Sequence, residues 1–149
     1  ADGQHDLAAV TDFLDQAHHN PQALVCGYPI YDQTVPLSRL WGRELTNFWV
    51  HVNTRSKALR DAMCGFRVYP LAQTLPVLPS VKTRRMDFDP DIVVRLIWAG
   101  VTVINRPVRV TYPKDGISHF RGFSDSMRIS RLHAGHFCTM LLRRMGLAK

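Results

Sequence analysis

The chain has 149 residues, of which 46% are hydrophobic and 21% are charged. These fractions are typical of globular proteins and exclude disordered, collagen-like and fibrous classes. The 19 Lys and Arg outnumber the 12 Asp and Glu, so we expect anionic partners such as phosphate groups, lipid head groups or nucleic acid. Three cysteines lie far apart without a C-x-x-C pair, which indicates a reducing compartment.

The first half of the chain alternates predicted helices with short predicted strands. Apolar spacing predicts a helix over 6–17, with Asp6 as its N-cap, and a buried strand over 23–26. Pro29 and Pro36 predict an irregular loop between them. A second helix over 37–55 and a short strand over 66–69 are expected to follow.

The second half is predicted to begin with a helical turn or two near 76–79. Asp89-Pro90 is a typical helix start, with Asp89 as N-cap, and Gly100 is a typical C-terminal glycine. Arg106-Pro107 is expected to separate two strands. The predicted elements are a helix over 89–99, strands over 101–104 and 108–112, and a last helix over 124–144. This order predicts an α/β fold.

Acidic and basic residues are divided unevenly along the chain. Residues 1–38 contain five Asp and no Lys or Arg, whereas all 19 basic residues follow. This asymmetry indicates a cation site beside an anion site, or only a polar face near each end.

Three short motifs carry oxygen ligands, a phosphate-binding pattern or carboxylates. Asp2 and Gln4, at alternate positions, can face one Mg²⁺ or Mn²⁺, or form a plain polar turn. Gly65 beside Arg67 allows a guanidinium to bind a phosphate, or forms a tight turn with a surface arginine. The carboxylates of 87–91 cap a helix or supply a general base.

The last helix combines apolar residues with arginines. Such a helix can lie on an anionic membrane surface, or pack on its own domain with a solvated basic face. His133 and His136 lie at i, i+3, but no nearby carboxylate or cysteine motif completes a zinc site. No nucleic-acid-binding module is recognisable, so nucleic acid is not an expected partner.

Taken in order, the motifs resemble family 2 glycosyltransferases of the GT-A fold, in the branch similar to dolichyl-phosphate mannosyltransferase. The first segment matches an Asp-x-Asp-x-Gln-His signature from its second position onward. The similar segments are Ala1-Asp2-Gly3-Gln4-His5, Ser38-Arg39 with Arg43, Asp61 with Gly65-Phe66-Arg67, Asp89-Pro90-Asp91 through Arg95 to Gly100, Arg106-Pro107-Val108, and Gly116-Ile117-Ser118.

The resemblance implies that the chain is the C-terminal portion of a GT-A domain, Rossmann-like with a mixed sheet. Residues 1–123 would be a partial glycosyltransferase domain that begins inside the metal motif, and 124–149 a basic amphipathic helix. The strands that bind the nucleotide would precede Ala1. We therefore expect this portion alone to be inactive.

The same resemblance assigns roles to individual residues. Asp2 and Gln4 would hold the divalent cation, while Arg67 and Asp61 would lie at the donor phosphates. Asp89, with Asp91 as second choice, would be the base. The acceptor side would be formed by Arg39, Arg43, Ser118 and His119.

The expected activity is metal-dependent, inverting transfer of a sugar from a nucleotide-diphosphate sugar. The acceptor would be a lipid phosphate or a hydroxyl group of a lipid-linked or glycan molecule. We expect a cytoplasmic protein, with peripheral membrane contact through the last helix at the inner face of the membrane. The alternative is a non-catalytic basic module that binds an anionic membrane or nucleic acid.

Overall fold

The chain folds around a mixed sheet of three strands in the order β2-β1-β3. The computed structural model describes residues 6–31, 35, 37–111 and 122–147. β1 (Leu24–Tyr31) lies parallel to β3 (Val103–Val110), and its other side pairs antiparallel with β2 (Arg67–Val68). The parallel pair runs in register from Leu24 opposite Val103 to Tyr31 opposite Val110, so both strands end at the same edge.

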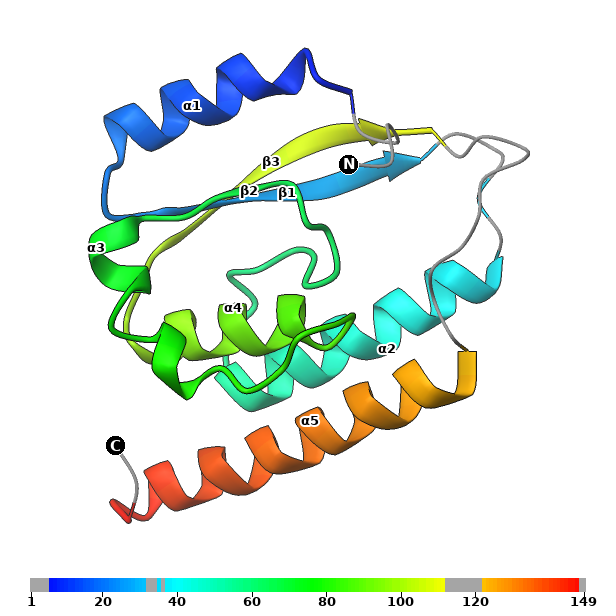
Figure 1. Cartoon of the computed structure of the whole chain (residues 1–149), viewed down its shortest axis with the longest axis vertical. Coiled ribbons are helices and arrows are strands. Elements are labelled where there is room, and N and C mark those ends of the chain that lie inside the picture. Colours follow the sequence, from blue (N-terminus) through cyan, green and yellow to red (C-terminus); the bar gives the residue numbers. More distant parts are fainter. Residues whose placement is uncertain (1–5, 32–34, 36, 112–121, 148–149) are drawn as a thin grey trace.

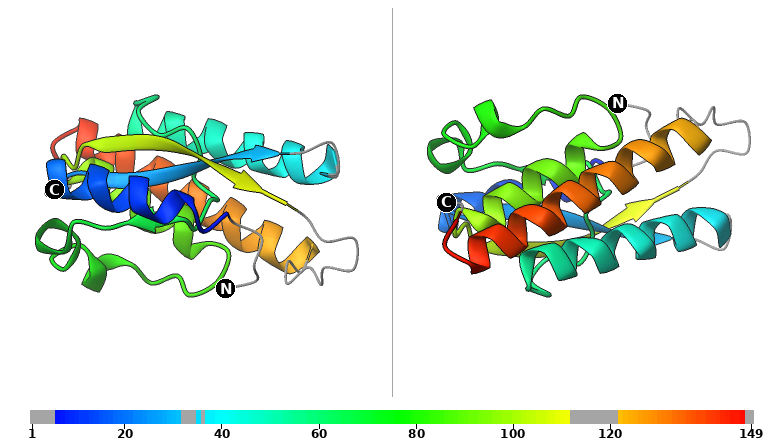
Figure 2. Two further views of the ribbon diagram at one scale, coloured as in Figure 1. Left: turned by 90° about the horizontal axis from the view of Figure 1, so that it is seen from above. Right: turned by 90° about the horizontal axis from the view of Figure 1, so that it is seen from below.

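Helices cover both faces of this sheet. α1 lies on one face, α2 and α4 lie on the other, and α5 packs outside α2 and α4 (Figure 1). Seen from below, α5 runs along both of these helices (Figure 2). The helices are α1 (Ala9–His19), α2 (Leu37–Thr54), α3 (Leu71–Thr74), the 3₁₀ helix η1 (Leu78–Ser80), α4 (Phe88–Trp98) and α5 (Gly122–Arg144). The predicted α/β class is confirmed.

Two strands differ from their predictions because each continues through a proline. The two strands expected over 101–104 and 108–112 are one strand, β3, which continues through Pro107. β3 is an edge strand, where a residue without an N–H group is tolerated. Pro29 likewise lies within β1, beyond the two residues that pair with β2. The prediction that a loop begins at Pro29 was therefore wrong.

The start of α4 also differs from its prediction. Asp87, and not Asp89, is the N-cap, so Pro90 occupies the third helical position. Proline is tolerated there because the first four N–H groups of a helix have no partner within it. The predicted glycine ending is confirmed, since Gly100 has a φ of 83° just after the helix.

Apolar residues of β1, α2, α4 and the segments that follow α2 and α4 form the main core beneath the sheet. It contains Leu24, Cys26, Val50, Leu59, Ala62, Ile92, Val93, Val94, Leu96 and Val101. On the α1 side, Phe13 meets Phe66 edge to face at 4.8 Å between ring centroids. None of the described helices has the length and hydropathy to cross a membrane.

Gly27 of β1 packs tightly against the segment before β2. A Cβ atom there would lie 2.9 Å from the Phe66 carbonyl oxygen and 3.1 Å from Cys64 Sγ. We expect Gly27→Ala to lower the free energy of unfolding by about 1–3 kcal/mol, because backbone must move to admit the methyl group. Denaturant unfolding measures this loss. Gly42→Ala is the matched control, since its Cβ meets nothing within 4 Å and should be stabilising.

Candidate functional site

Two arginines and two aspartates form a charged cluster between the sheet and the helices beneath it. We call Arg43, Asp61, Arg67 and Asp89 the ion cluster. It consists of two salt bridges, Arg43–Asp61 at 2.5 Å and Arg67–Asp89 at 3.1 Å. Its members come from α2, the segment before β2, β2 itself and the first turn of α4. The fold therefore brings together four residues that the sequence predicted as site residues.

Arg67 is the buried member that holds the cluster to the backbone. Its side chain has no exposed surface. Nη1 donates to the Asp89 carbonyl oxygen at 3.1 Å and to Tyr69 Oη at 3.3 Å, while Nη2 donates to the Ala62 carbonyl oxygen at 2.8 Å. Because these donors point into the protein, Arg67 can fix Asp89 but does not reach solvent.

Asp89 is the member of the Arg67–Asp89 pair that reaches the surface. About a third of its side chain, 31%, is exposed. Burial raises the pKa of its carboxyl group above the ordinary value, although Arg67 acts in the opposite direction. A fixed, accessible carboxylate with a raised pKa has the properties of a general base.

The second pair of the ion cluster lies at the carboxyl end of β1. Asp61 is buried, and its Oδ1 accepts the backbone N–H groups of Met63 and Cys64 at 2.9 and 2.6 Å. Arg43 extends over the ring of Tyr31, the last residue of β1, at 5.7 Å from the centroid. The Arg43 side chain is 19% exposed, so it can meet an anion at this edge of the sheet.

Asp91, the second choice for a base, faces away from the ion cluster. Its carboxylate accepts hydrogen bonds from Arg95 Nε at 2.6 Å and Thr83 Oγ1 at 2.9 Å, and lies 2.9 Å from His136 Nε2. Burial acts against ionisation, but these hydrogen bonds together hold the pKa of Asp91 below its ordinary value. Asp91 is nearly inaccessible and joins α4 to α5, which suits a structural role.

Several predicted site residues lie outside the described part of the chain. These are Asp2, Gln4, Ser118 and His119, and the side chain of Arg39. Within the described residues, no group of three or more His, Cys, Asp or Glu could hold a metal ion. The predicted metal ligands therefore stay predictions.

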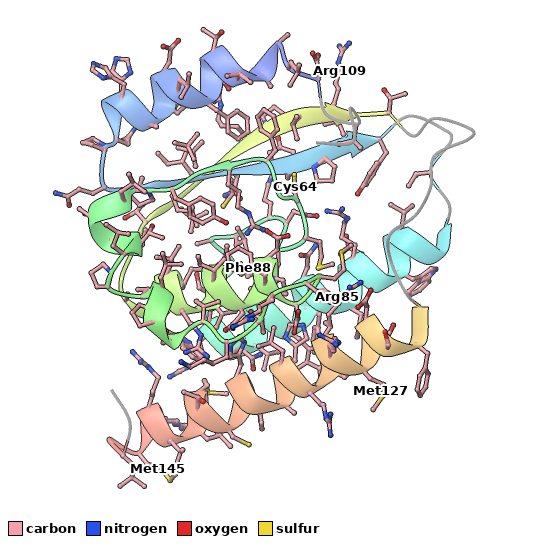
Figure 3. All side chains as sticks on the ribbon, viewed as in Figure 1. Cys64, Arg85, Phe88, Arg109, Met127 and Met145 are labelled. Carbon is pink, nitrogen blue, oxygen red and sulfur yellow. The ribbon has the colours of Figure 1, made fainter. Side chains whose placement is uncertain are left out.

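The described chain starts beside the same sheet edge. The Asp6 N–H donates to the carbonyl oxygen of Arg109, near the carboxyl end of β3, at 3.1 Å. Figure 3 shows Arg109 at that edge of the sheet. The segment that follows the predicted metal motif thus begins near the strand ends where Arg43 and Tyr31 meet.

The sequence did not single out two tyrosines that complete the surroundings of the ion cluster. Tyr69 shares a hydrogen bond with Arg67, and burial raises the pKa of its phenol. Its position two residues after Arg67 in a short extended segment was a usable signal, because alternate residues share a face. Tyr31 gave no such signal, since its neighbour Arg43 comes from a helix.

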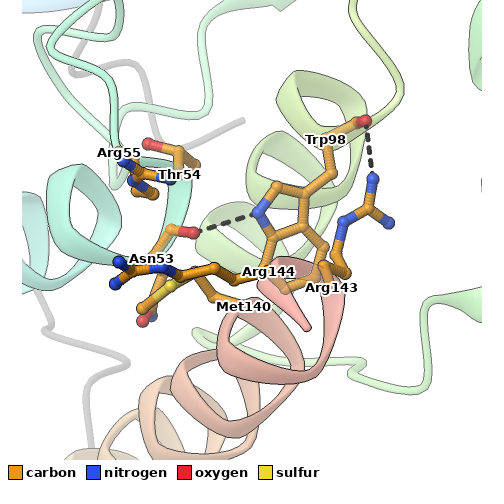
Figure 4. Close-up of a pocket in the computed structure, with 7 residues that line it drawn as sticks. All are labelled: Asn53, Thr54, Arg55, Trp98, Met140, Arg143 and Arg144. Atoms are coloured by element: carbon orange, nitrogen blue, oxygen red, sulfur yellow. Dashed lines mark hydrogen bonds between the residues drawn. The ribbon is translucent and has the colours of Figure 1, made fainter. Parts of the chain in front are cut away.

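A separate pocket lies between the C-terminal parts of α2, α4 and α5 (Figure 4). Its volume is about 230 Å³, and no member of the ion cluster lines it. Trp98 Nε1 donates to the Asn53 carbonyl oxygen at 3.0 Å, and Arg143 Nη2 donates to the Trp98 carbonyl oxygen at 3.1 Å. The other lining residues are Thr54, Arg55, Met140 and Arg144.

No protein-family model, curated protein or solved structure matches the chain. The function of the chain is therefore inferred from its motifs and from the geometry of the ion cluster.

Proposed function

We propose that this chain carries the acceptor side of a GT-A glycosyltransferase of family 2, as the order of its motifs implies. The reaction is the inverting transfer of a sugar from a nucleotide-diphosphate sugar to a hydroxyl or lipid-phosphate acceptor. Asp89 is assigned as the catalytic base for a hydroxyl acceptor.

The observation that carries the proposal is the state of Asp89. Arg67 forms a salt bridge with the carboxylate of Asp89 and donates a hydrogen bond to its backbone carbonyl oxygen. The position of Asp89 is therefore fixed before an acceptor arrives. The exposed part of the carboxylate can approach a hydroxyl group, and its raised pKa strengthens it as a base. Asp91 offers neither access nor basicity, which favours Asp89 among the two candidates.

The proposed step moves one proton and exchanges two bonds. The acceptor hydroxyl gives its proton to Asp89 as its oxygen bonds to the anomeric carbon of the donor sugar. The bond from that carbon to the diphosphate breaks, and the nucleoside diphosphate leaves. An anionic lipid phosphate needs no base, and Arg43 would then position it.

The charged groups divide the remaining tasks. Arg67 is a positioning residue in this proposal, because its side chain is enclosed and both Nη1 and Nη2 donate hydrogen bonds inside the protein. Asp2 and Gln4 would hold a Mg²⁺ or Mn²⁺ ion, which would neutralise the diphosphate of the donor. Their test is Mn²⁺-dependent donor binding, which Asp2→Ala should abolish.

The activity test uses the natural protein that contains these residues. Transfer of labelled sugar from a set of UDP- and GDP-sugars to lipid and glycan acceptors is measured with Mn²⁺ and with EDTA. For a hydroxyl acceptor, Asp89→Asn should lower kcat by about 10²- to 10⁴-fold, because the base is lost. Donor binding should change little.

Asp15→Asn is the matched control, because this exposed carboxylate lies on α1, across the sheet from Asp89. It should leave kcat unchanged. An Asp89→Asn protein that transfers sugar to hydroxyl acceptors at the normal rate would remove Asp89 as the base. Absence of transfer from every donor would favour the non-catalytic module.

A further inference from the structure

The last helix is built with its polar side inward. The residues of α5 that are buried against the body are Asp125, Ile129, His133 and His136, three of them polar. Its outward side carries Phe123, which is 84% exposed. Figure 3 shows Met127 and Met145 on the side of α5 that points away from the body. This is the reverse of a helix that packs with its apolar side and leaves a basic face in water.

The exposed apolar side of α5 continues onto α2. Trp49 joins the two helices, since its ring lies 6.3 Å from that of Phe137 and 5.6 Å from that of Phe48. On α2, exposed apolar residues recur at helical spacing, and Trp41 is 76% exposed. We call this surface the apolar face; it consists of Trp41, Leu45 and Phe48 on α2, Phe123, Met127, Phe137 and Leu141 on α5, and Met145 just after α5. Soluble monomers rarely leave a large continuous patch of this kind in water.

Most of the exposed charges beside the apolar face are basic, although Glu44 of α2 is an exposed acid one helical turn from Trp41 and Phe48. The only acid of α5 is Asp125, which is 1% exposed, so the outer surface of the helix carries no carboxylate. Arg128 and Arg131 are exposed on the same helix. At the far end, Arg55 and Arg144 line the pocket between α2 and α5. A partner that suits this surface has an apolar interior, which the apolar face can enter, and an anionic surface, which the arginines can contact.

We propose that the apolar face docks on an anionic lipid surface. Aromatic and aliphatic side chains of α2 and α5 enter the boundary between head groups and acyl chains, and the arginines contact lipid phosphates. A second copy of the chain fits less well. Pairing through the same face would bring the arginines of two copies together, and the chain carries a net charge of +7.

Vesicle binding tests this proposal, and it does not depend on sugar transfer. Binding of the purified protein is measured by co-sedimentation with phosphatidylcholine vesicles that contain or lack phosphatidylglycerol. We expect binding only with the anionic lipid, and weakening as salt rises. Phe123→Ser combined with Met127→Ser should reduce binding by about tenfold or more. Arg128→Gln and Arg131→Gln should each reduce it by about fivefold.

Two exposed positions elsewhere provide matched controls. Leu14→Ser removes an exposed leucine from α1, on the opposite side of the sheet. Arg109→Gln removes an exposed arginine from β3, also away from α5. Both variants should bind vesicles as the unchanged protein does.

Three results would overturn the proposal. They are equal binding to neutral vesicles, binding that survives Phe123→Ser with Met127→Ser, and the absence of binding to anionic vesicles. Light scattering distinguishes the rival occupant. If the protein is a dimer that the same pair of substitutions dissociates, a second copy of the chain covers the face.

Discussion

Arg67→Met should lower the free energy of unfolding by about 3–5 kcal/mol, the cost typical of removing one partner from a buried ion pair. The substitution keeps most of the apolar volume but removes the donors to Asp89, Tyr69 and Ala62. The two carbonyl oxygens that Arg67 satisfied would lose this donor, and the Asp89 carboxylate would lose its countercharge. Denaturant unfolding at neutral pH measures the change.

An exposed ion pair supplies the control for this effect. Arg106→Met breaks a similar bridge, in which Arg106 Nη2 lies 2.6 Å from Asp12 Oδ1, but both side chains are more than a third exposed. Water screens that pair, so its loss should be much smaller. Equal losses for the two variants would show that burial of Arg67 adds nothing.

A double variant separates the ion pair from simple loss of packing. Asp89→Asn removes the charge that Arg67 faces, so Arg67→Met and Asp89→Asn share one interaction. Their combined loss should be smaller than the sum of the single losses by about 1–3 kcal/mol. Additive losses would contradict the pairing.

The helices could be predicted because each has a local signal. Breaking residues and apolar spacing placed α1, α2, α4 and α5 within a few residues of their ends. The strands were harder, since Pro29 and Pro107 resemble breaks when read locally. Both prolines are tolerated because each lies where one side of its strand has no partner strand. Which side is unpaired depends on the strand order of the sheet.

The orientation of α5 could not be read from its apolar residues. The sequence shows apolar and basic residues on one helix but does not show which side meets the body. Asp91 and Asn53 supply polar partners for His136 and His133, and these two partners lie 45 and 80 residues away along the chain. The buried side of α5 is therefore decided by hydrogen bonds across the fold.

The sequence predicted which residues belong to the candidate site, but not which of them pair with one another. Local motifs singled out Arg67 and Asp89 separately, and the resemblance added Arg43 and Asp61. The contacts between them join residues 18 and 22 positions apart, which no local pattern specifies. Nor could the sequence show that Arg67 is enclosed while Asp89 reaches solvent, because burial depends on how α4 packs beneath the sheet.

His133 should make the protein less stable as pH falls from about 6.5 to about 4. This side chain is buried between α5 and α2, where its ring stacks on Trp49, and burial lowers its pKa to about 4 from the ordinary 6.5. In this range the unfolded chain binds a proton that the folded protein excludes. Acid therefore favours unfolding, and the loss reaches about 3 kcal/mol near pH 4.

His133→Gln tests this assignment by its effect on the slope. Glutamine does not titrate, so the free energy of unfolding of the variant should depend less on pH between about 4 and 6.5, even if the variant is weaker at neutral pH. The raised pKa of Asp89 gives the free energy of unfolding a pH slope of opposite sign, at pH values above the ordinary carboxyl pKa. Asp89 is present in both proteins, so its contribution cancels in the difference.

His18→Gln, at an exposed position on α1, is the control and should keep the original slope. If His133→Gln and the unchanged protein lose stability in parallel as pH falls, protonation of His133 is not the cause, and the acid sensitivity arises elsewhere.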